Sequence, residues 1–371
     1  MPAVDTVVQC DVRPSFRVRQ VEGMFDVPVE ARSARRFTAE LPGDDEPWRI
    51  GAIVGPSGSG KTTLAKTAFA AALARRRRWP RRAAVIDAFG AWPIKTITAT
   101  LTAVGFSSPP AWLRPYHTLS NGERFRCDLA RALLTGGRQV VFDEFTSVVD
   151  RTVACIASAA VAKAVRADRV QARQFVAVSC HYDILDWLCP DWVLDLATGE
   201  LIRGSLQRPL YRRPAIELEL FRCGRETWPL FAPHHYLTGE LHVSSQCYLA
   251  TWQGLPVAFA ALLHAVGHRD WLRVSRLVTL PDYQGVGIGG AVLDAVCHQA
   301  RQTGKRVTIT TGHPAMIRRL GNSPRWRRRR ITRAGVGKNT HRAYAGCQAA
   351  ARAVASFEYE PSPIRRDLQP A

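Results

Sequence analysis

The first half of the chain alternates between short apolar runs and segments of helical character. Continuous apolar runs at residues 50–54, 139–142 and 175–179 have the length of buried strands. An alanine-rich helix is predicted over about 61–74, and a second helix over about 122–134. This alternation predicts an α/β fold for the first half of the chain.

The pattern changes after Gly204, where a basic segment containing prolines precedes a new series of elements. The elements predicted there are, in chain order, a strand at 216–220, a helix at 227–237, a hairpin at 247–263, a strand at 272–280, a helix at 290–303 and a strand at 305–311. A chain of 371 residues is long enough for two domains. The predicted organisation is an α/β domain at 1–204, a linker at 205–213, a second, mixed α/β domain at 214–345 and a partly disordered tail at 346–371.

Charge and composition narrow the classes of partner. The formal net charge is +20, with 51 Lys and Arg against 31 Asp and Glu. Such an excess favours acidic partners, such as nucleic acid, and anionic cofactors. Arginine far outnumbers lysine and alanine is abundant, a composition that coding bias in a GC-rich genome also produces. The charge alone therefore does not decide the partner.

Other features of the sequence indicate a cytoplasmic protein. No run of about 18 apolar residues is present, so no membrane span is predicted. Residues 1–20 carry charges early and lack the apolar segment of a secretory signal. The nine cysteines form no C-x-x-C pair, which favours reduced thiols over disulfides or structural zinc.

The segment from Gly55 to Thr62 reads G-x-x-x-x-G-K-[ST] and lies between a predicted strand and a predicted helix. Gly55, Gly58 and Gly60 let backbone N–H groups point at a polyphosphate, and the helix N-terminus adds partial positive charge. Lys61 can reach the outer phosphates, and the Thr62 hydroxyl can bind Mg²⁺. A glycine-rich turn without a ligand is the alternative, but the motif and its strand–loop–helix context together predict a phosphate-binding loop.

Further candidates for nucleotide hydrolysis follow in order. The strand at 139–142 ends in Asp143, which can hold the metal, and Glu144, which can polarise an attacking water. The strand at 175–179 leads to His181, which is placed to contact the outermost phosphate. Taken singly, an acidic pair at a strand end is often a solvated edge, and an isolated histidine is more often structural.

In their order, these motifs resemble those of an ABC-type ATPase. That family has a phosphate-binding loop, an LSGGQ signature, a strand ending in two acids, a D-loop acid and a switch histidine, and the resemblance covers about residues 15–204. It implies ATP and Mg²⁺ as cofactors, and a head-to-tail homodimer in which the signature of one subunit closes on the ATP of the other. The residues it implies are Gly55, Gly58, Gly60, Lys61, Thr62 and Thr63 for phosphates and Mg²⁺, Ser120 and Gly122 for the signature, Glu144 as hydrolytic base, Asp150 as D-loop acid and His181 as switch.

Two departures from the family pattern bear on function. The signature carries Asn121 and Glu123 where the family has glycine and glutamine. No glutamine occurs between Leu64 and Leu119, so the Q-loop glutamine is missing, and Asp87 is the candidate replacement. The arm between the phosphate-binding loop and the signature is also short for a transporter ATPase. Because a permease would engage that arm and the Q-loop, a permease partner is not expected.

A second glycine-rich loop lies between the strand at 272–280 and the helix at 290–303. It fits Q/R-x-x-G-x-G/A, the motif that cradles the pyrophosphate of coenzyme A in GNAT acyltransferases, so residues 213–345 resemble a GNAT domain. A flexible turn is the alternative for the loop taken alone. The resemblance implies acetyl-CoA, or another acyl-CoA, as donor. The residues it implies are Gln284, Gly285, Gly287, Gly289 and Gly290 in the loop, with Leu277 and Val278 on the strand that pairs with the pantetheine arm.

The catalytic residues of the second domain are sought among its histidines and carboxylates. Acyl transfer to an amine needs a base for the ammonium proton and a donor for the leaving thiolate. GNAT enzymes often place a glutamate on the strand before the loop, but residues 273–276 contain no carboxylate. The candidates are His234 and His235 at the end of a predicted helix, and His313 at a strand end expected to face the same cleft. The weaker candidates are His264 and Asp282.

Two arginine clusters each surround one tryptophan, Trp79 within residues 75–82 and Trp326 within residues 325–330. Arginine binds phosphate and an indole can stack on an unpaired base, so the clusters favour nucleic acid over a merely solvated surface. No helix-turn-helix, zinc-finger or RNP pattern is present, so sequence-specific readout is not indicated.

Three functions are compatible with these patterns. The favoured one is an enzyme that couples ATP-driven dimer closure to acylation of a macromolecule, such as nucleic acid. The second is a nucleic-acid-binding repair or maintenance ATPase with a degenerate GNAT-like binding module. The third, a transporter ATPase subunit, is the least compatible because the Q-loop glutamine is missing and the arm is short.

Overall fold

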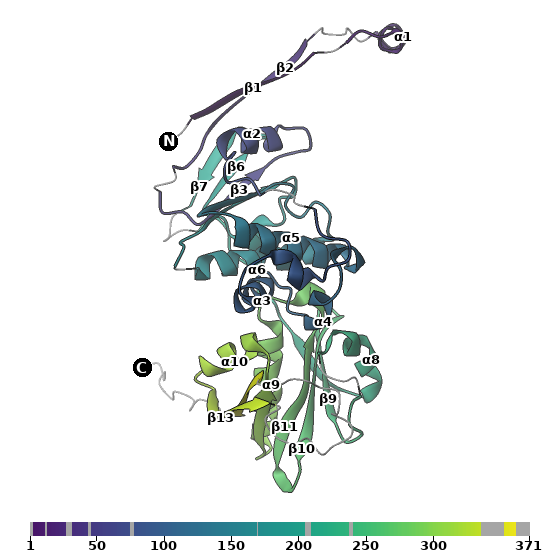
Figure 1. The fold of residues 1–371 in the computed structure, drawn as a ribbon, viewed down its shortest axis with the longest axis vertical. Coiled ribbons are helices and arrows are strands. Elements are labelled where there is room, and N and C mark those ends of the chain that lie inside the picture. The colour runs from purple at the N-terminus through teal and green to yellow at the C-terminus, as the bar shows by residue number, and fades with distance from the viewer. Residues whose placement is uncertain are drawn as a thin grey trace, which may run out of the picture. The chain divides into compact units, whose positions relative to one another are not determined.

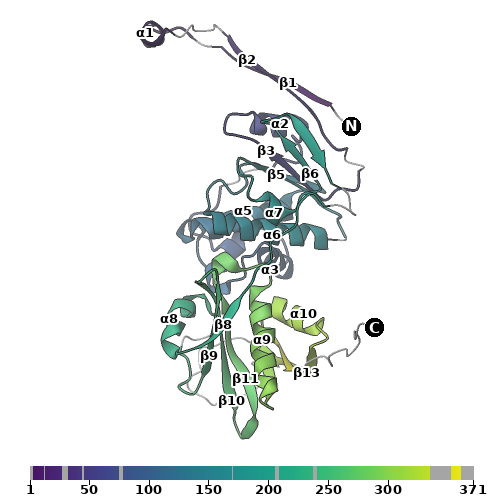
Figure 2. The ribbon, with the colours of Figure 1, turned by 180° about the vertical axis from the view of Figure 1, so that it is seen from behind.

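The chain divides into two compact units in the computed structural model (Figures 1 and 2). The first unit comprises Met1–Arg78 and Arg124–Pro214, and the second comprises Trp79–Glu123 and Ala215–Ala371. The structure describes residues 3–11, 13–26, 32–43, 46–74, 78–168, 170–204, 209–236, 240–334 and 352–360. The predicted mixed α/β class is confirmed by the element order, in which helices and strands alternate through both units.

The first unit is built on a five-stranded sheet with the strand order β4–β5–β3–β6–β7 (Figure 1). The first four of these strands run parallel, and β7 is antiparallel to β6 at one edge. Every residue of β3 and β5 is buried, which explains their continuous apolar sequences. The strand bounds are β3 (Ile50–Val54), β4 (Gln139–Phe142), β5 (Gln174–Ser179), β6 (Trp192–Asp195) and β7 (Glu200–Arg203).

Helices cover both faces of this sheet. α2 (Lys61–Ala68) packs on one face through Leu64 and Ala65, while α5 (Asn121–Thr135) and α6 (Arg151–Ala167) lie on the other face in both views (Figures 1 and 2). α2 is shorter than predicted because residues 72–74 pair with Val141 of β4 instead of continuing the helix. The unit also contains α7 (Leu185–Leu188), α1 (Phe16–Phe25) and an antiparallel pair, β1 (Ala3–Asp11) and β2 (Arg32–Glu40).

The second unit is built on a seven-stranded sheet with the order β13–β14–β12–β11–β10–β9–β8. β11 and β12 pair in parallel, and all other neighbours pair antiparallel. The predicted hairpin turn at Gln253 and Gly254 is confirmed, with positive φ at both residues. The strand bounds are β8 (Glu219–Cys223), β9 (Gln246–Trp252), β10 (Leu255–Ala265), β11 (His268–Thr279), β12 (Arg306–Thr311), β13 (Trp326–Ala334) and β14 (Arg352–Tyr359).

β11 and β12 pair over only part of their length. Their register runs from Trp271 opposite Arg306 to Val274 opposite Ile309 and stops there. At the same level β11 has an irregularity, because Val274 lies opposite Leu262 and Arg276 opposite Ala261, which leaves Ser275 unmatched on β10. The two strands therefore diverge towards their carboxyl ends. From Ser275 to Thr279 this edge of β11 is open, since no strand that the structure describes pairs with it there.

Both faces of this sheet are covered as well. α9 (Ile288–Gln302) packs on one face against Ala258, Ala260 and Leu262 of β10. α8 (Trp228–Phe231) packs on the opposite face against Phe259 and Ala261. α8 is much shorter than the predicted 227–237 helix, because Pro233 breaks the segment and a 3₁₀ turn (Ala232–His234) follows.

The arm between α2 and α5 belongs to the second unit, whereas the sequence placed it within a first domain at 1–204. It contains a 3₁₀ helix η1 (Val85–Phe89), α3 (Ile94–Ala103), α4 (Pro109–Trp112) and a 3₁₀ turn η2 (Tyr116–Thr118). α3 contacts α10 (Pro314–Gly321) of the same unit. The assignment of the arm to the second unit rests on tertiary contacts, which no sequence motif indicates.

β14 lies between β12 and β13, so the sheet extends past residue 345, where the sequence placed the start of a tail. Ala355, Phe357 and Tyr359 alternate into the core, and this strand was not predicted from the sequence. The rest of the predicted tail and residues 205–208 of the predicted linker lie outside the described residues. Among the helices that the structure describes, none is long and apolar enough to cross a membrane.

Candidate functional site

The first glycine-rich loop connects β3 to α2, as its motif requires. Gly55, Gly58 and Gly60 all have positive φ, at 151°, 78° and 89°. A Cβ on Gly55 would also lie 2.8 Å from the Ser59 Oγ. Backbone conformation and space therefore both favour glycine in this loop.

The side chains around the loop suit a metal-bound polyphosphate. The Lys61 ammonium donates hydrogen bonds to the carbonyl oxygens of Gly55 (2.8 Å) and Pro56 (2.6 Å) of its own loop. The Thr62 hydroxyl, at the start of α2, lies 3.2 Å from the Asp143 carboxylate at the end of β4. A hydroxyl and a carboxylate together are the hard oxygen ligands that Mg²⁺ prefers. An Mg²⁺–nucleotide therefore fits the residues present.

The acids and histidine that follow lie at the carboxyl ends of β4 and β5. Glu144 is exposed, has a φ of 52°, and its backbone N–H donates to Asp143. The His181 Nδ1 lies 3.4 Å from the hydroxyl of buried Thr146. Burial lowers the pKa of His181, and Arg151 lowers it further against the opposing charge of Asp183. His181 is therefore held in the neutral form near pH 7.

Asp150 and Ser120 both cap helices. The Asp150 carboxylate accepts from the Val153 N–H at the start of α6. Ser120 precedes α5, where its hydroxyl accepts from the Glu123 N–H (3.2 Å) and the Glu123 carboxylate accepts from the Ser120 N–H (2.9 Å). This is a capping box. The unusual Glu123 of the signature thus has a structural role, which the spacing S-x-x-E could have revealed.

The second glycine-rich loop connects β11 to α9. Gly285 and Gly287 have φ values of 93° and 106°, and Gly287 is the N-cap of α9. A Cβ on Gly289 would lie 2.6 Å from the Thr279 Oγ1, and one on Gly290 would lie 2.0 Å from the Arg319 guanidinium. The loop therefore presents backbone N–H groups at the start of a 15-residue helix, an arrangement that binds anions.

The Gln284 side chain makes hydrogen bonds within the protein, whereas the family motif implied that it binds the coenzyme. Its side-chain N–H donates to the Thr279 carbonyl (2.9 Å), and its Oε1 accepts from both the N–H and the hydroxyl of Ser107, each at 2.8 Å. The side chain therefore fixes the loop against β11 and the arm, and a ligand of the loop would meet its backbone.

Leu277 and Val278 lie on the open edge of β11 but point away from it. Leu277 packs against the core beneath α9, and Val278 is buried in the core beneath α8. Any molecule that pairs with this edge would therefore contact the backbone of these residues instead of their side chains.

The predicted histidines gather in the second unit. His313 is the N-cap residue of α10, just after β12, and its ring centroid lies 6.3 Å from that of Tyr236. The Tyr236 ring in turn stacks on His235 at 5.2 Å. His234 is half-buried; burial lowers its pKa, and the nearby carboxylates of Glu123 and Asp282 oppose that shift. The rings of His235 and His313 therefore both lie against Tyr236.

His313 has the features of a proton acceptor. Burial lowers the pKa of its imidazole, and a hydrogen bond to the Ser107 backbone partly opposes the shift. Because that bond favours the protonated form, the ring is its donor and the carbonyl its acceptor. The Nδ1 is buried and has no hydrogen-bond partner in the part of the chain that the structure describes. The ring is thus neutral near pH 7, with one nitrogen available to accept a proton.

Comparison with known families identifies part of the chain. Residues 213–321 match the model described as the acetyltransferase (GNAT) family. The chain carries a GNAT acetyltransferase domain. A search of curated protein sequences finds no match.

Solved structures of two kinds are similar to parts of the chain. One is the ribosomal-protein-S18-alanine N-acetyltransferase of Escherichia coli, with 14% identity, coverage of 41% of this chain and 99% of the other, and a TM-score of 0.31. Another is a GNAT family acetyltransferase from Elizabethkingia anophelis with acetyl-CoA bound (15%, 39% and 98%, TM-score 0.30). A third is a dimeric bacterial ABC transporter cassette (14%, 43% and 87%, TM-score 0.35). The family match, not these likenesses, identifies the domain.

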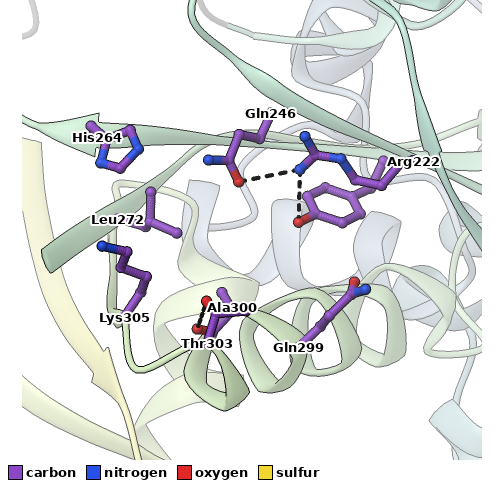
Figure 3. Close-up of a pocket in the computed structure, with 9 residues that line it drawn as sticks. Arg222, Gln246, His264, Leu272, Gln299, Ala300, Thr303 and Lys305 are labelled. Atoms are coloured by element: carbon purple, nitrogen blue, oxygen red, sulfur yellow. Dashed lines mark hydrogen bonds between the residues drawn. The ribbon is translucent and has the colours of Figure 1, made fainter.

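A cavity of about 320 Å³ lies elsewhere in the GNAT domain (Figure 3). His264 and Lys305 line one side, and Arg222 lies on the other, where it donates to Gln246 and Tyr248. The cavity also contacts Thr303 beyond the last residue of α9, whereas the glycine-rich loop is at the first turn, about 20 Å away along the helix. His264 is therefore remote from the glycine-rich loop.

The tryptophans of both arginine clusters have partners within the second unit. Trp326 is 5% exposed, and its Nε1 donates to Asp294 at 2.9 Å. Trp79 stacks on Tyr116 with a centroid distance of 4.6 Å and an interplanar angle of 5°. The prediction that Trp326 stacks on a nucleic-acid base is wrong because its indole is in the core. Arg75 to Arg77 lie outside the described residues.

Among the described residues, no group of three or more histidines, cysteines and carboxylates is arranged to hold a metal ion.

Proposed function

We propose that the protein transfers an acyl group from acetyl-CoA, or another acyl-CoA, to an amine, and that ATP binding in its first unit controls this transfer. The observation that carries the proposal is the position of His313. It follows β12 where β12 diverges from β11, and the GNAT loop follows β11 on the other side of the same divergence. A donor held by that loop and by the open edge of β11 would have the free Nδ1 of His313 beside it.

The residues of the domain suit each step of acyl transfer. The His313 Nδ1 accepts the proton that the attacking amine loses as its nitrogen bonds to the acyl carbon. Backbone N–H groups on the open edge of β11 stabilise the oxyanion that forms there. The bond between the acyl carbon and sulfur then breaks, and the thiolate recovers a proton from the histidinium. The N-terminus of α9 holds the pyrophosphate throughout.

The first unit supplies the control. Lys61 and the N–H groups of the loop would hold the phosphates of ATP, and Thr62 and Asp143 would hold Mg²⁺, which supplies charge neutralisation when bound. Glu144 is the proposed base for hydrolysis and His181 the proposed switch. The resemblance to ABC-type ATPases supports a homodimer closed by ATP through Ser120 and Gly122, in the cytoplasm.

For the acceptor we propose a polyanion with a free amine, and nucleic acid as its class. The net charge of +20 and the exposed Arg328 and Arg330 of β13 support this choice. Part of the same cluster is neutralised, because Arg306, Arg327 and Arg329 all pair with the buried Glu358. Binding would therefore rest on phosphate contacts and depend strongly on salt.

One observation favours a second function, a maintenance ATPase whose GNAT domain only binds. β11 has no carboxylate at 273–276, where a catalytic glutamate would be expected. Coenzyme A binding without transfer to any acceptor would favour this alternative.

The test is a transfer assay with labelled acetyl-CoA and DNA, RNA, protein and polyamine fractions, each with and without ATP. We expect label in nucleic acid, and more label with ATP.

His313→Gln should lower the rate by about 10²-fold or more, while His264→Gln, in the remote cavity, should not. Because the pKa of His313 lies below the ordinary value of about 6.5, the wild-type rate should hold down to that pH and fall only below it. A wild-type rate that falls above pH 7, or is unchanged by His313→Gln, would contradict the role of His313.

A further inference from the structure

Ser107 contacts both halves of the proposed acyltransfer site. It lies in the arm between α3 and α4, and its N–H and hydroxyl both donate to the Gln284 Oε1 at 2.8 Å. Its carbonyl accepts from the His313 imidazole. One residue therefore fixes the loop that follows β11 and the histidine that follows β12, on the two sides of the divergence between these strands.

The arm is built to hold Ser107 in place. Its two ends are joined where the Val85 N–H donates to the Arg114 carbonyl at 3.0 Å and Ala84 pairs with Pro115. Phe106, directly before Ser107, is fully buried, and its carbonyl accepts from the Trp112 indole at 3.0 Å. A displacement of the arm would therefore move Ser107 with it.

The same arm ends at the signature. η2 leads directly into Ser120, whose capping box with Glu123 begins α5. Glu123 is only 8% exposed, and its charge also acts on His234. The signature residues that would close on ATP are thus joined to the proposed acyltransfer site through the arm, which leads from Ser120 back to Ser107.

We propose that Ser107 is a positioning residue for acyl transfer, and that the arm carries the ATP-dependent signal from the signature to the acyl-CoA site. Closure of the signature on ATP shifts the arm, and Ser107 changes the positions of Gln284 and His313 together. This inference rests on the proposed function.

The test uses the full-length chain with Glu144→Gln, which retains ATP, and measures coenzyme A binding by calorimetry with and without ATP. Ser107→Ala removes one of the two donors to Gln284, and Ser107→Thr keeps it. Thr102→Val is the matched control, because the Thr102 hydroxyl lies in the same arm but donates within α3, to the Thr98 carbonyl at 2.7 Å.

We expect ATP to change the Kd of coenzyme A several-fold in the parent and in Ser107→Thr and Thr102→Val, and to have little effect in Ser107→Ala. The Ser107→Ala variant should also bind coenzyme A about fivefold more weakly, because it lacks the hydrogen bond from the Ser107 hydroxyl to Gln284. ATP affinity should be the same in all four proteins. A merely structural role would weaken coenzyme A binding but leave the ATP-dependent ratio unchanged.

Two results overturn the inference. One is a Kd of coenzyme A that does not respond to ATP in the parent, and the other is an equal response in Ser107→Ala. Neither affects the proposed acyl transfer, which fails separately if the wild-type chain binds coenzyme A but acylates no acceptor.

Discussion

The two glycine-rich loops share one plan but differ in what holds them. Each follows a strand, opens a helix, and has glycines at positive φ. In the first loop the only lysine folds back onto the carbonyls of Gly55 and Pro56. In the second loop there is no lysine, and Gln284 is held by Ser107, 177 positions away in the sequence. The first loop is locally self-contained, whereas the shape of the second depends on a distant segment.

This difference has a physical consequence. A loop that carries its own cation gains most of its affinity from charge, and removing that charge removes binding without disturbing other parts of the fold. A loop that binds through backbone N–H groups gains its affinity from shape, so its sensitivity lies in glycine positions and in the contacts that hold them. Substitutions in the two loops should therefore fail in different ways.

The largest effect should follow Lys61→Ala. Loss of the ammonium from a charged contact with phosphate costs about 2–5 kcal/mol, so ATP binding should weaken at least about thirtyfold. Coenzyme A binding without ATP should not change. Calorimetry with each ligand measures both.

Lys66→Ala is the control for Lys61→Ala, because Lys66 is an exposed lysine in the last turn of the same helix. It should bind ATP as the wild type does. A parallel loss of coenzyme A affinity in Lys61→Ala would break the comparison, since the first loop would then not be self-contained.

The sequence predicted where each loop lies, because the motif that marks each loop is made of neighbouring residues. Strand, glycines and helix start all lie within a short stretch, so Gly55 to Thr62 and Gln284 to Gly290 could be located from the sequence. The position of Ser107 could not be predicted, because a serine in an arm carries no motif and its partner is remote. The prediction that Trp326 binds nucleic acid was wrong because it used only the neighbouring arginines. The burial of Trp326 depends on its contacts with Asp294 and Tyr359, which are distant in the sequence.

A smaller effect is expected for Gly289→Ala, which tests shape without charge. The new Cβ would lie 2.6 Å from the Thr279 Oγ1, and overpacking of this kind costs about 1–3 kcal/mol. Coenzyme A binding should weaken about tenfold, with ATP binding unchanged. Thr279→Ala should restore binding in the double variant because the clashing atom is removed, whereas Thr279→Val, which keeps the same shape, should not. Failure of Thr279→Ala to rescue would mean that Gly289 is required by the ligand itself.

The smallest effect is expected one residue later, for Gly290→Ala. Its Cβ would meet Arg319 at 2.0 Å, but this is the far end of a flexible side chain whose relative exposure is 38%. Arg319 can move away and lose only its contact with Asp294, which is worth less than about 1 kcal/mol at such exposure. Coenzyme A binding should therefore weaken less than about fivefold. In an Arg319→Ala background the same change should be neutral, or slightly stabilising in a thermal melt, because alanine favours a helix. If Gly290→Ala still impaired coenzyme A binding in that background, the new methyl group would be obstructing the coenzyme itself. The second loop would then lie in close contact with its ligand at Gly290.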